Sequence, residues 1–276
     1  MAKNGGIITL LLAITCILSC VKPIASREDN YTLLWADEFN EDTINHAYWS
    51  KMQRVKNVRS FCHFTDDARM FEKKKGFLRL WARYNNGYAP ADTAHFLTAG
   101  ITSAGKKTFQ FGKIMIRARM HGAIGTWPAI WVMPEDKKRW GVDHKQYAEI
   151  DICEYVDRND FVYQTAHNHY TLQDKAHWSK PPHQSLPKIK TGKFNIYCVE
   201  ILPDELIFSV NGKETLHYPR IDNIEYQYPY GIESQIRIHE QVNPPKWWSP
   251  QGIDVNSFPG YMDIDWVRVY SLKDNK

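Results

Sequence analysis

The stretch AEIDICEY, residues 148–155, places three carboxylates in one short apolar run. Side chains of an extended strand alternate between its two faces, so Glu149 and Asp151 share a face and Glu154 points to the other. One extra residue at Ile152-Cys153, a β-bulge, would return Glu154 to the face of the first two acids. We therefore predict a bulged strand that gathers three carboxylates on one face.

The residues around these acids argue against an ordinary solvated sheet surface. Apolar residues separate the acids and no Lys or Arg lies among them, which predicts a strand inside a sheet rather than at its edge. Carboxylates this close repel one another and raise at least one pKa. Two carboxyl groups about 5–5.5 Å apart are typical of retaining glycosidases, in which one is the nucleophile and the other the acid and then the base. The alternative is a metal site in an anchored structural module.

The hairpin after this strand supplies a partner for the acids. VDRND, residues 156–160, is typical of a turn. Pairing about its centre sets His167 opposite Glu149 and Thr165 opposite Asp151. We expect His167 to hydrogen-bond the acids. A one-residue slip in register would instead make it a structural histidine on the other face.

Short segments with period-two alternation, or rich in aromatic and β-branched residues, run along the rest of the chain. Asn211-Gly212 is the strongest hairpin signal, and no amphipathic stretch reaches the length of a confident helix. This pattern predicts an all-β fold, an antiparallel β-sandwich or jelly roll. The predicted strands are 31–39, 76–84, 109–120, 129–134, 147–156, 161–171, 194–202, 205–210, 234–239 and 262–270.

Two tryptophans precede the acidic strand, in GTWPAIWVMP, residues 125–134. Trp127 and Trp131 share a face if this segment is extended. Aromatic rings stack on the apolar faces of sugars, whereas acids and amides bind the hydroxyl groups. We expect at least one of the two to line a saccharide cleft; the alternative is that they fill the core.

Several segments, in this order, resemble the signatures of glycoside hydrolase family 16. The ExDxxE spacing is similar to the bulged form of laminarinases, agarases, carrageenases and endo-β-galactosidases, and differs from the unbulged ExDxE of lichenases. The resemblance spans nearly the whole chain after its N-terminal segment. The segments are WADEF (35–39), FGKIMIRARM (111–120), GTWPAIWVMP (125–134), EIDICE (149–154) and GYMDIDWVRVY (260–270).

The resemblance implies a concanavalin A-like β-jelly roll with an open concave substrate cleft, and a catalytic domain over residues 31–276. It implies an endo-acting β-glycosidase that retains anomeric configuration and requires no cofactor. Glu149 would be the nucleophile, Glu154 the general acid/base, and Asp151 the carboxylate between them. The substrate contacts implied by the resemblance are Trp127, Trp131, His167 and Gln241.

The substrate is less well defined by the sequence. EIDICEY with FVYQTAHNHYT (161–171) is more similar to lipoprotein endo-β-galactosidases, which favours internal β-galactosidic bonds in mucin-type O-glycans or keratan-like glycans. The alternatives are an endo-β-1,3-glucanase (laminarinase) and, from another class, a non-catalytic lectin-like jelly roll. We expect residues 84–95 and 171–190, predicted loops at the ends of the cleft, to distinguish between them.

Metal and partner predictions come from single residues and from composition. Some family members carry a structural calcium, for which Glu38 and Asp265 are candidate oxygen ligands; surface acids are the alternative. The formal net charge of +4 comes without a basic block, which argues against nucleic-acid binding, and we expect a monomer. Cys62, Cys153 and Cys198 have no CxxC spacing, so neither a zinc site nor a disulfide framework is predicted, although one disulfide remains open.

The N-terminal segment is typical of an exported lipoprotein. Lys3 precedes an apolar, charge-free run with the length of a signal-peptide core. Leu18-Ser19-Cys20 resembles a bacterial lipobox, in which Cys20 becomes the lipidated first residue. We predict a signal peptide at residues 1–19, a lipidated Cys and tether at 20–30, and anchoring at the bacterial outer membrane or cell surface. The alternative is an ordinary signal peptide.

Overall fold

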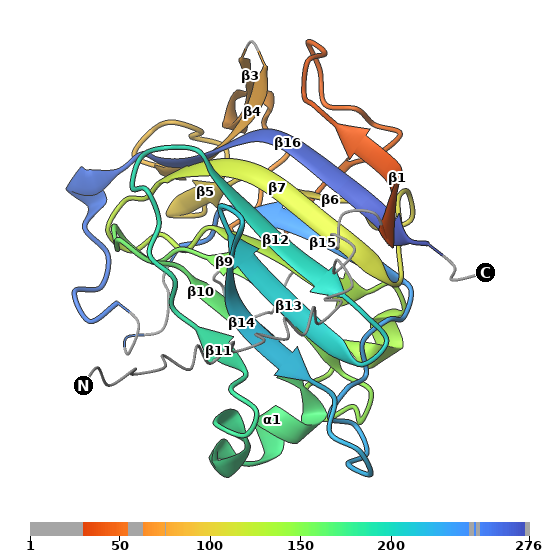
Figure 1. The fold of residues 1–276 in the computed structure, drawn as a ribbon. Helices are drawn as coiled ribbons and strands as arrows, with labels where there is room; N and C mark the ends of the chain where they lie inside the picture. The colour runs from red at the N-terminus through yellow and green to blue at the C-terminus, as the bar shows by residue number, and fades with distance from the viewer. Residues whose placement is uncertain (1–29, 55–62, 75, 243–245, 247–248, 274–276) are drawn as a thin grey trace, which may run out of the picture. The chain divides into compact units, whose positions relative to one another are not determined.

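The computed structural model describes residues 30–54, 63–74, 76–242, 246 and 249–273. Residues Tyr31–Lys276 cluster in one compact unit, whose ribbon is shown in Figure 1. The predicted signal peptide, Cys20 and the tether before Asn30 lie outside the described residues and stay predictions. Within the described ranges, no helix is long and apolar enough to cross a membrane.

Two antiparallel sheets make up this unit, which confirms the predicted β-sandwich (Figure 1). The nine-stranded sheet contains β14 (Lys213–Pro219), β13 (Glu205–Val210), β12 (Asn195–Ile201), β7 (Gly112–His121), β16 (Gly260–Leu272), β4 (Phe77–Tyr84) and β3 (Phe71–Lys74) in spatial order, with β1 (Tyr31–Asp37) paired to β16 and β5 (Phe96–Thr98) paired to β4. The seven-stranded sheet runs β11 (Gln184–Ser185), β10 (Tyr163–Asn168), β9 (Ala148–Glu154), β8 (Ala129–Pro134), β15 (Ser234–His239), β6 (Gly100–Thr102) and β2 (Ser50–Lys51).

The core lies between the facing sheets. Ile114 and Ile116 of β7 are fully buried, as are Ile130 of β8 and Ile238 of β15, and all belong to one apolar cluster. Burial of each such side chain contributes about 1.5–3 kcal/mol to folding. Side chains alternate along a strand. The residues directly before and after Ile130 on β8, and those directly before and after Ile238 on β15, therefore point to the outer face of the seven-stranded sheet.

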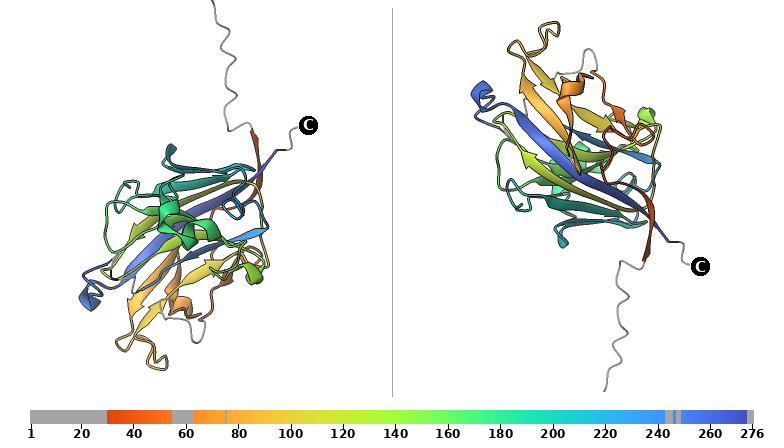
Figure 2. Two further views of the ribbon diagram at one scale, coloured as in Figure 1. Left: turned by 90° about the horizontal axis from the view of Figure 1, so that it is seen from below. Right: turned by 90° about the horizontal axis from the view of Figure 1, so that it is seen from above.

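The first and last strands close the unit on one side. β1 pairs antiparallel with β16 from Tyr31 opposite Leu272 to Asp37 opposite Val267. Figure 2 shows β1, in red, beside the end of β16, in blue, near the C-terminus. The two ends of the described chain are therefore joined through one ladder of backbone hydrogen bonds.

The predicted hairpin at Asn211-Gly212 is confirmed. Asn211 and Gly212 have φ values of 53° and 78°, the left-handed conformations that a type I′ turn requires at both central positions. The turn joins β13 to β14, which pair antiparallel.

The predicted strand at 161–171 is too long. β10 ends at Asn168, and a short helix, α1 (His169–Gln173), follows. The Asn168 side chain accepts a hydrogen bond from the backbone N–H of Thr171, and the Thr171 side chain bonds back to Asn168 in a capping box. The cap begins a helix where the β-branched and aromatic composition predicted a continuing strand.

Candidate active site

The three predicted acids lie on β9, which is bulged at the predicted position. On β10, Thr165 lies opposite Asp151 and Tyr163 lies opposite Glu154. One residue therefore separates the pair on β10, whereas two, Ile152-Cys153, separate the acids on β9. The extra residue reverses the alternation, as the sequence predicted.

The ladder to β8 shows on which face the acids lie. Asp151 is opposite Trp131, and Glu154 is opposite Ala129. Trp131 and Ala129 are two residues apart and share a face of β8, so Asp151 and Glu154 share the corresponding face of β9. Glu149, two residues before Asp151, points the same way. We call this outer face of the seven-stranded sheet the acid face.

His167 lies where the hairpin register predicted it. It is opposite Glu149 in the β9–β10 ladder, and its Nε2 lies 3.2 Å from Oδ2 of Asp151. Burial alone would lower the pKa of His167, but the hydrogen bond to Asp151 and the charges of Asp151 and Glu149 raise it overall. His167 is thus a cationic partner for the two carboxylates when it is protonated.

Tyr147 is a site residue that the sequence analysis missed. Its hydroxyl donates a hydrogen bond to Oε2 of Glu149, and the side chain is buried. Tyr147 and Glu149 are two residues apart, so the alternation that grouped the acids could also have identified it. The hydroxyl stabilises the ionised form of Glu149.

The two glutamates have different electrostatic surroundings. Burial and then the charge of Asp151 raise the pKa of Glu149, whereas His167 and the Tyr147 hydroxyl act in the opposite direction. Burial and the charges of Asp151 and Glu149 raise the pKa of Glu154 well above its usual value, and the indole of Trp127 opposes this. Two carboxyl groups whose surroundings separate their pKa values are suited to different roles in acid–base chemistry.

Both predicted tryptophans contact the acid face. Trp127 donates from Nε1 to Oε1 of Glu154 at 3.0 Å. Trp131, opposite Asp151, donates from Nε1 to Nε2 of His239 at 2.7 Å. Both side chains are half-buried, so neither is solely a core residue.

His239 is a second residue that the sequence analysis missed. Because its Nε2 accepts a hydrogen bond from Trp131, the ring proton resides on Nδ1. Burial and then the charge of Arg237 lower the pKa of His239 to about 3, which keeps the ring neutral and able to accept. Nε2 of Gln241 lies 3.4 Å from Nε2 of His239. The backbone carbonyl of Gln241 accepts a hydrogen bond from the Trp127 backbone N–H at 2.8 Å.

A row of side chains crosses the acid face perpendicular to the strands. The ladders place Asp151 beside Trp131, then Arg237 of β15, Thr102 of β6 and Ser50 of β2. The Arg237 guanidinium lies 4.6 Å from the centre of the Trp131 ring. Strands are about 4.8 Å apart, so the face extends roughly 19 Å from the acids toward β2 and about 10 Å toward β11.

The chain matches the family model described as glycosyl hydrolases family 16 over residues 59–268. The chain belongs to glycosyl hydrolase family 16. The resemblance that the sequence motifs indicated is therefore confirmed.

Relatives and solved structures within this family differ in their substrates. The chain is 28% identical over 245 residues to a keratan-sulfate endo-1,4-beta-galactosidase of Sphingobacterium multivorum, covering 88% of this chain and 56% of that protein. The laminarinase of Rhodothermus marinus is similar in structure, with a TM-score of 0.74, 25% identity, and coverage of 88% of this chain and 98% of that one. A structure from work on endo-acting O-glycanases of the human gut microbiota that initiate mucin breakdown has a TM-score of 0.69 and 25% identity, covering 88% and 100%.

These likenesses confirm the β-jelly roll predicted from the sequence. The chain spans little more than half the length of the keratan-sulfate galactosidase. The part of this chain that matches the family model, residues 59–268, includes the bulged acidic strand and both strands beside it.

One group in this family 16 chain has the donor set for a metal ion. A ligand atom from each of Glu149, Asp151 and His167 lies within 4.8 Å of the others. These side chains already bond to one another and to Tyr147. The same cluster therefore supports either acid catalysis or cation binding on geometry alone.

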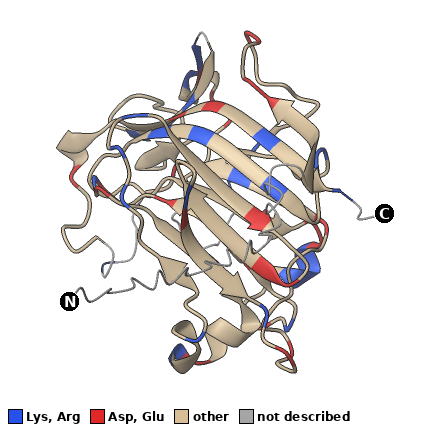
Figure 3. Ribbon diagram, viewed as in Figure 1, with Lys and Arg blue, Asp and Glu red and all other residues tan. Residues whose placement is uncertain are grey.

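The candidate calcium ligands do not form a comparable group. Glu38 accepts from Nε and Nη2 of Arg268 at 2.8 and 3.0 Å, and Asp265 pairs with Arg117. Figure 3 shows residues of both signs interspersed over the nine-stranded sheet. Because a guanidinium already neutralises each carboxylate, these two residues do not fit a calcium site, and the calcium prediction gains no support here.

The structure describes two of the three cysteines considered for a disulfide, and both are buried free thiols. Cys153 is in the bulge and Cys198 is in β12. Burial raises the pKa of both thiols. The possible disulfide is therefore not formed between these two residues, and Cys62 lies outside the described residues.

Chain segments flank both ends of the acid face. α1 and the 3-10 turn Lys175–Trp178 connect β10 to β11 at one edge of the sheet, in the lower part of Figure 1. At the other edge lie residues 52–54, which follow β2, and Arg54 bonds Asp92 in the connection from β4 to β5. That connection includes residues 85–95 of the predicted loop at 84–95. The predicted loop at 171–190 contains the end of α1, the 3-10 turn and β11.

Proposed function

We propose that this family 16 protein is a retaining endo-β-glycoside hydrolase that works by double displacement. Glu149 attacks the anomeric carbon while Glu154 gives its proton to the departing glycosidic oxygen. This forms a bond between the sugar and Glu149 and breaks the bond between the two sugars. Glu154 then takes a proton from water, whose oxygen displaces Glu149 and releases the second product.

The observation that carries this proposal is the bulge, because it brings Glu154 to the face of Glu149. Among the described residues, no group hydrogen-bonds Oε2 of Glu154. The raised pKa of Glu154 favours the protonated form that a general acid needs. Tyr147 and His167 stabilise the ionised form of Glu149 that a nucleophile needs. Asp151, which His167 bonds, lies between the two glutamates and raises the pKa of Glu149 through its own charge.

The position of the acids within the sheet supports endo action. β9 has two strands on one side, β10 and β11, and four on the other, β8, β15, β6 and β2. A saccharide that crosses the strands can therefore extend from the acids in both directions. An exo-acting enzyme would instead need a wall on one side of the acids.

The substrate we favour is an internal β-galactosidic bond in a keratan-like or mucin-type O-glycan. This is supported by the likeness to the keratan-sulfate endo-1,4-beta-galactosidase and to the structure from the O-glycanase work. The alternative is a β-1,3-glucan, supported by 26% identity over 281 residues to a beta-glucanase of Rhodothermus marinus. A non-catalytic, lectin-like role is less favoured, because all three acids are present.

The test is a product profile on laminarin, keratan and mucin O-glycans with the wild type and Glu149→Gln. We expect hydrolysis of a galactose-containing glycan by the wild type, and no turnover but retained oligosaccharide binding by Glu149→Gln. Glu205→Gln, on an acid of β13 in the other sheet, is the matched control and should behave as the wild type. Binding without any hydrolysis by the wild type would favour the lectin.

We also propose export and lipid anchoring through Cys20 at the bacterial outer membrane or cell surface, with the catalytic unit as a monomer. The support is the Leu18-Ser19-Cys20 motif after the apolar run. Cells expressing the full chain should incorporate a labelled fatty acid into the protein, and Cys20→Ala should abolish the label. Label that persists in Cys20→Ala would contradict the proposal.

A further inference from the structure

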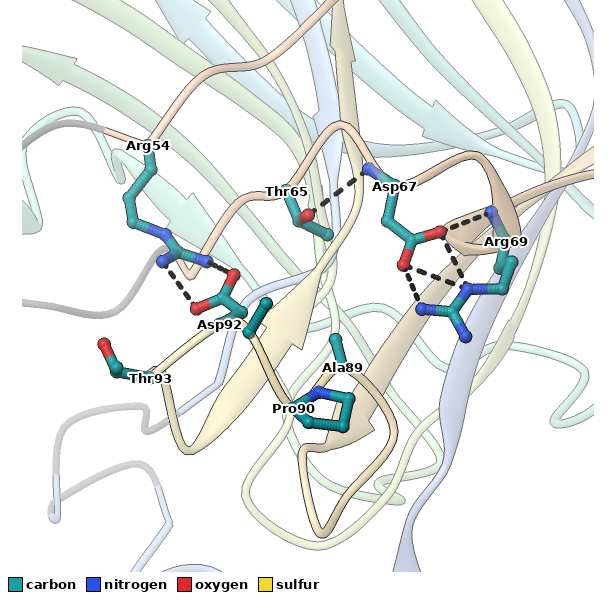
Figure 4. A pocket seen from close by; sticks show the side chains of 9 residues that line it. Arg54, Thr65, Asp67, Arg69, Ala89, Pro90, Asp92 and Thr93 are labelled. Carbon is teal, nitrogen blue, oxygen red and sulfur yellow. Dashed lines mark hydrogen bonds and ion pairs between the residues drawn. The ribbon is translucent and has the colours of Figure 1, made fainter.

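A hollow of about 600 Å³, lined by both charged and apolar residues, lies at the β2 end of the molecule. Its lining comes from the residues after β2, from the segment before β3, and from the loop between β4 and β5. Figure 4 shows Arg54 and Asp92 on one side and Asp67 and Arg69 on the other, with Pro90 between them. The volume lies within the range of pockets that hold small-molecule ligands.

Asn85 holds the loop that forms one wall. Its Nδ2 donates to the carbonyls of Asp92 and Ala94 at 2.8 and 2.9 Å, and its Oδ1 accepts from the Ala89 N–H at 2.8 Å. Asp92 also accepts from the Ala94 N–H. The wall is therefore organised before a ligand arrives, which lowers the entropic cost of binding.

The charges in the hollow balance. Arg54 bonds Asp92 through Nη1 and Nη2 at 2.9 and 2.8 Å, and Arg69 bonds Asp67 through Nε and Nη2. A sulfate or carboxylate would have to displace one of these acids or lie against it. Hydroxyl groups, which donate and accept, can bond both members of each pair without separating them.

The lining also offers unused polar capacity and an apolar surface. A guanidinium has five N–H groups, and Arg54 uses three of them, including Nε to the Phe64 carbonyl. The Arg69 side chain is 58% exposed. Ala89, Pro90 and Ala91 supply C–H groups beside these polar edges, a combination that suits a sugar ring.

Side-chain contacts connect the hollow to the acid face. The Phe64 backbone accepts from Arg54, and its ring packs edge-on against His239, with centres 5.4 Å apart. His239 in turn accepts from Trp131, which is opposite Asp151. The hollow therefore lies beyond the longer arm of the acid face, on the side that extends toward β2.

From this arrangement we propose that the hollow is a distal subsite for a neutral, hydroxyl-rich sugar residue of a long chain that is cleaved at the acids. The inference rests on the proposed function, because it takes that chain to be the substrate. It predicts that the enzyme prefers long oligosaccharides to short ones.

The test compares kcat/KM along a size series of neutral oligosaccharides, made from whichever glycan the wild type hydrolyses. Arg69→Ala should lower kcat/KM for long chains roughly fivefold to twentyfold through KM, since it removes hydrogen bonds from a charged group. The shortest chain cleaved should be unaffected. Ala91→Gln, which fills the hollow from an exposed position, should have the same effect. Lys74→Ala, which removes an exposed ion pair with Glu72 outside the hollow, should behave as the wild type at every length.

Other outcomes overturn the inference. An equal loss of kcat/KM at every chain length would show that the variant affects the acids or folding. No loss of kcat/KM at any length would show that the hollow is not a subsite. A loss confined to sulfated chains would make the hollow an anion site. If the wild type hydrolyses no glycan, the proposed function fails by itself. Calorimetry of long neutral oligosaccharides with wild type and Arg69→Ala would then test whether the hollow binds sugar. The same affinity in both proteins would contradict the subsite.

Discussion

The indole Nε1–H of Trp127 donates a hydrogen bond of 3.0 Å to Oε1 of Glu154. Trp127 precedes β8 and Glu154 ends β9, so this contact depends on the bulge that turns Glu154 toward the acid face. The bond stabilises the ionised carboxylate and lowers a pKa that burial raises. Trp127 therefore sets how strongly the proposed acid keeps its proton.

Trp127→Phe should raise the pKa of Glu154 further, because it removes this donor. The basic limb of the pH profile of kcat/KM should move to higher pH by roughly 1–2 pH units, the equivalent of one hydrogen bond to a charged group. Trp140→Phe, which removes an indole bonded to the Pro134 carbonyl, is the control. A basic limb that stays in place or moves to lower pH would contradict the role given to Trp127.

Tyr147→Phe should move the opposite limb. The lost hydroxyl stabilises ionised Glu149, so the pKa of Glu149 should rise and the acidic limb should move upward by about 1–2 pH units. The same pH titration of kcat/KM measures this change. Tyr228→Phe, which removes a hydroxyl bonded to the Leu202 backbone carbonyl, offers a comparison away from the acids. An unchanged acidic limb in Tyr147→Phe would show that Glu149 does not govern it.

Glu154→Ala should show an acid-specific defect. On a natural glycan, kcat should fall by about 10²–10⁴, the usual contribution of general acid–base catalysis. On an aryl glycoside whose leaving group departs without protonation, the first step should be much less affected, and added azide should restore turnover. Equal losses on both substrates would argue against Glu154 as the acid.

Glu154→Gln should stabilise the protein at alkaline pH. A carboxyl group whose folded-state pKa lies above its unfolded value makes unfolding easier as pH rises from the unfolded value toward the folded one. A difference of one between the folded and unfolded pKa corresponds to about 1.36 kcal/mol, and 1 kcal/mol to about 2–4 °C in Tm for a chain of this size. The Tm advantage of the variant over wild type should therefore be small at pH 4 and grow by several degrees toward pH 8.

Thermal unfolding monitored by circular dichroism at both pH values measures this difference. A constant difference between Glu154→Gln and wild type across pH would mean that Glu154 is not desolvated in the folded protein.

The bulge in the acidic strand could be predicted from sequence, because regular alternation would place Glu154 on the face opposite to Glu149 and Asp151. Three acids in an apolar run need a common face, and the spacing of Glu154 requires a bulge to supply it. The hairpin register of His167 followed from a turn only a few residues away, so local pairing was enough. Tyr147 was within reach of the same argument, at an offset of two from Glu149.

Long-range register could not be predicted in this way. His239 contacts Trp131 because β15 pairs with β8, two strands separated by about a hundred residues, and alternation within either strand does not reveal the pairing. The hollow likewise depends on Arg54 meeting Asp92 from separate loops. Strand 161–171 was overextended because the Asn168 cap competes with β propensity, and tertiary packing decides between them.

The bulge that turns Glu154 toward Glu149 would make the two glutamates a retaining pair. The most direct measurement is proton NMR of the anomeric signal during the first minutes of hydrolysis, before mutarotation, on whichever β-linked glycan the wild type cleaves. We predict that the new reducing end appears first as the β-anomer and then equilibrates. First appearance of the α-anomer would show inversion and would contradict Glu149 as a nucleophile.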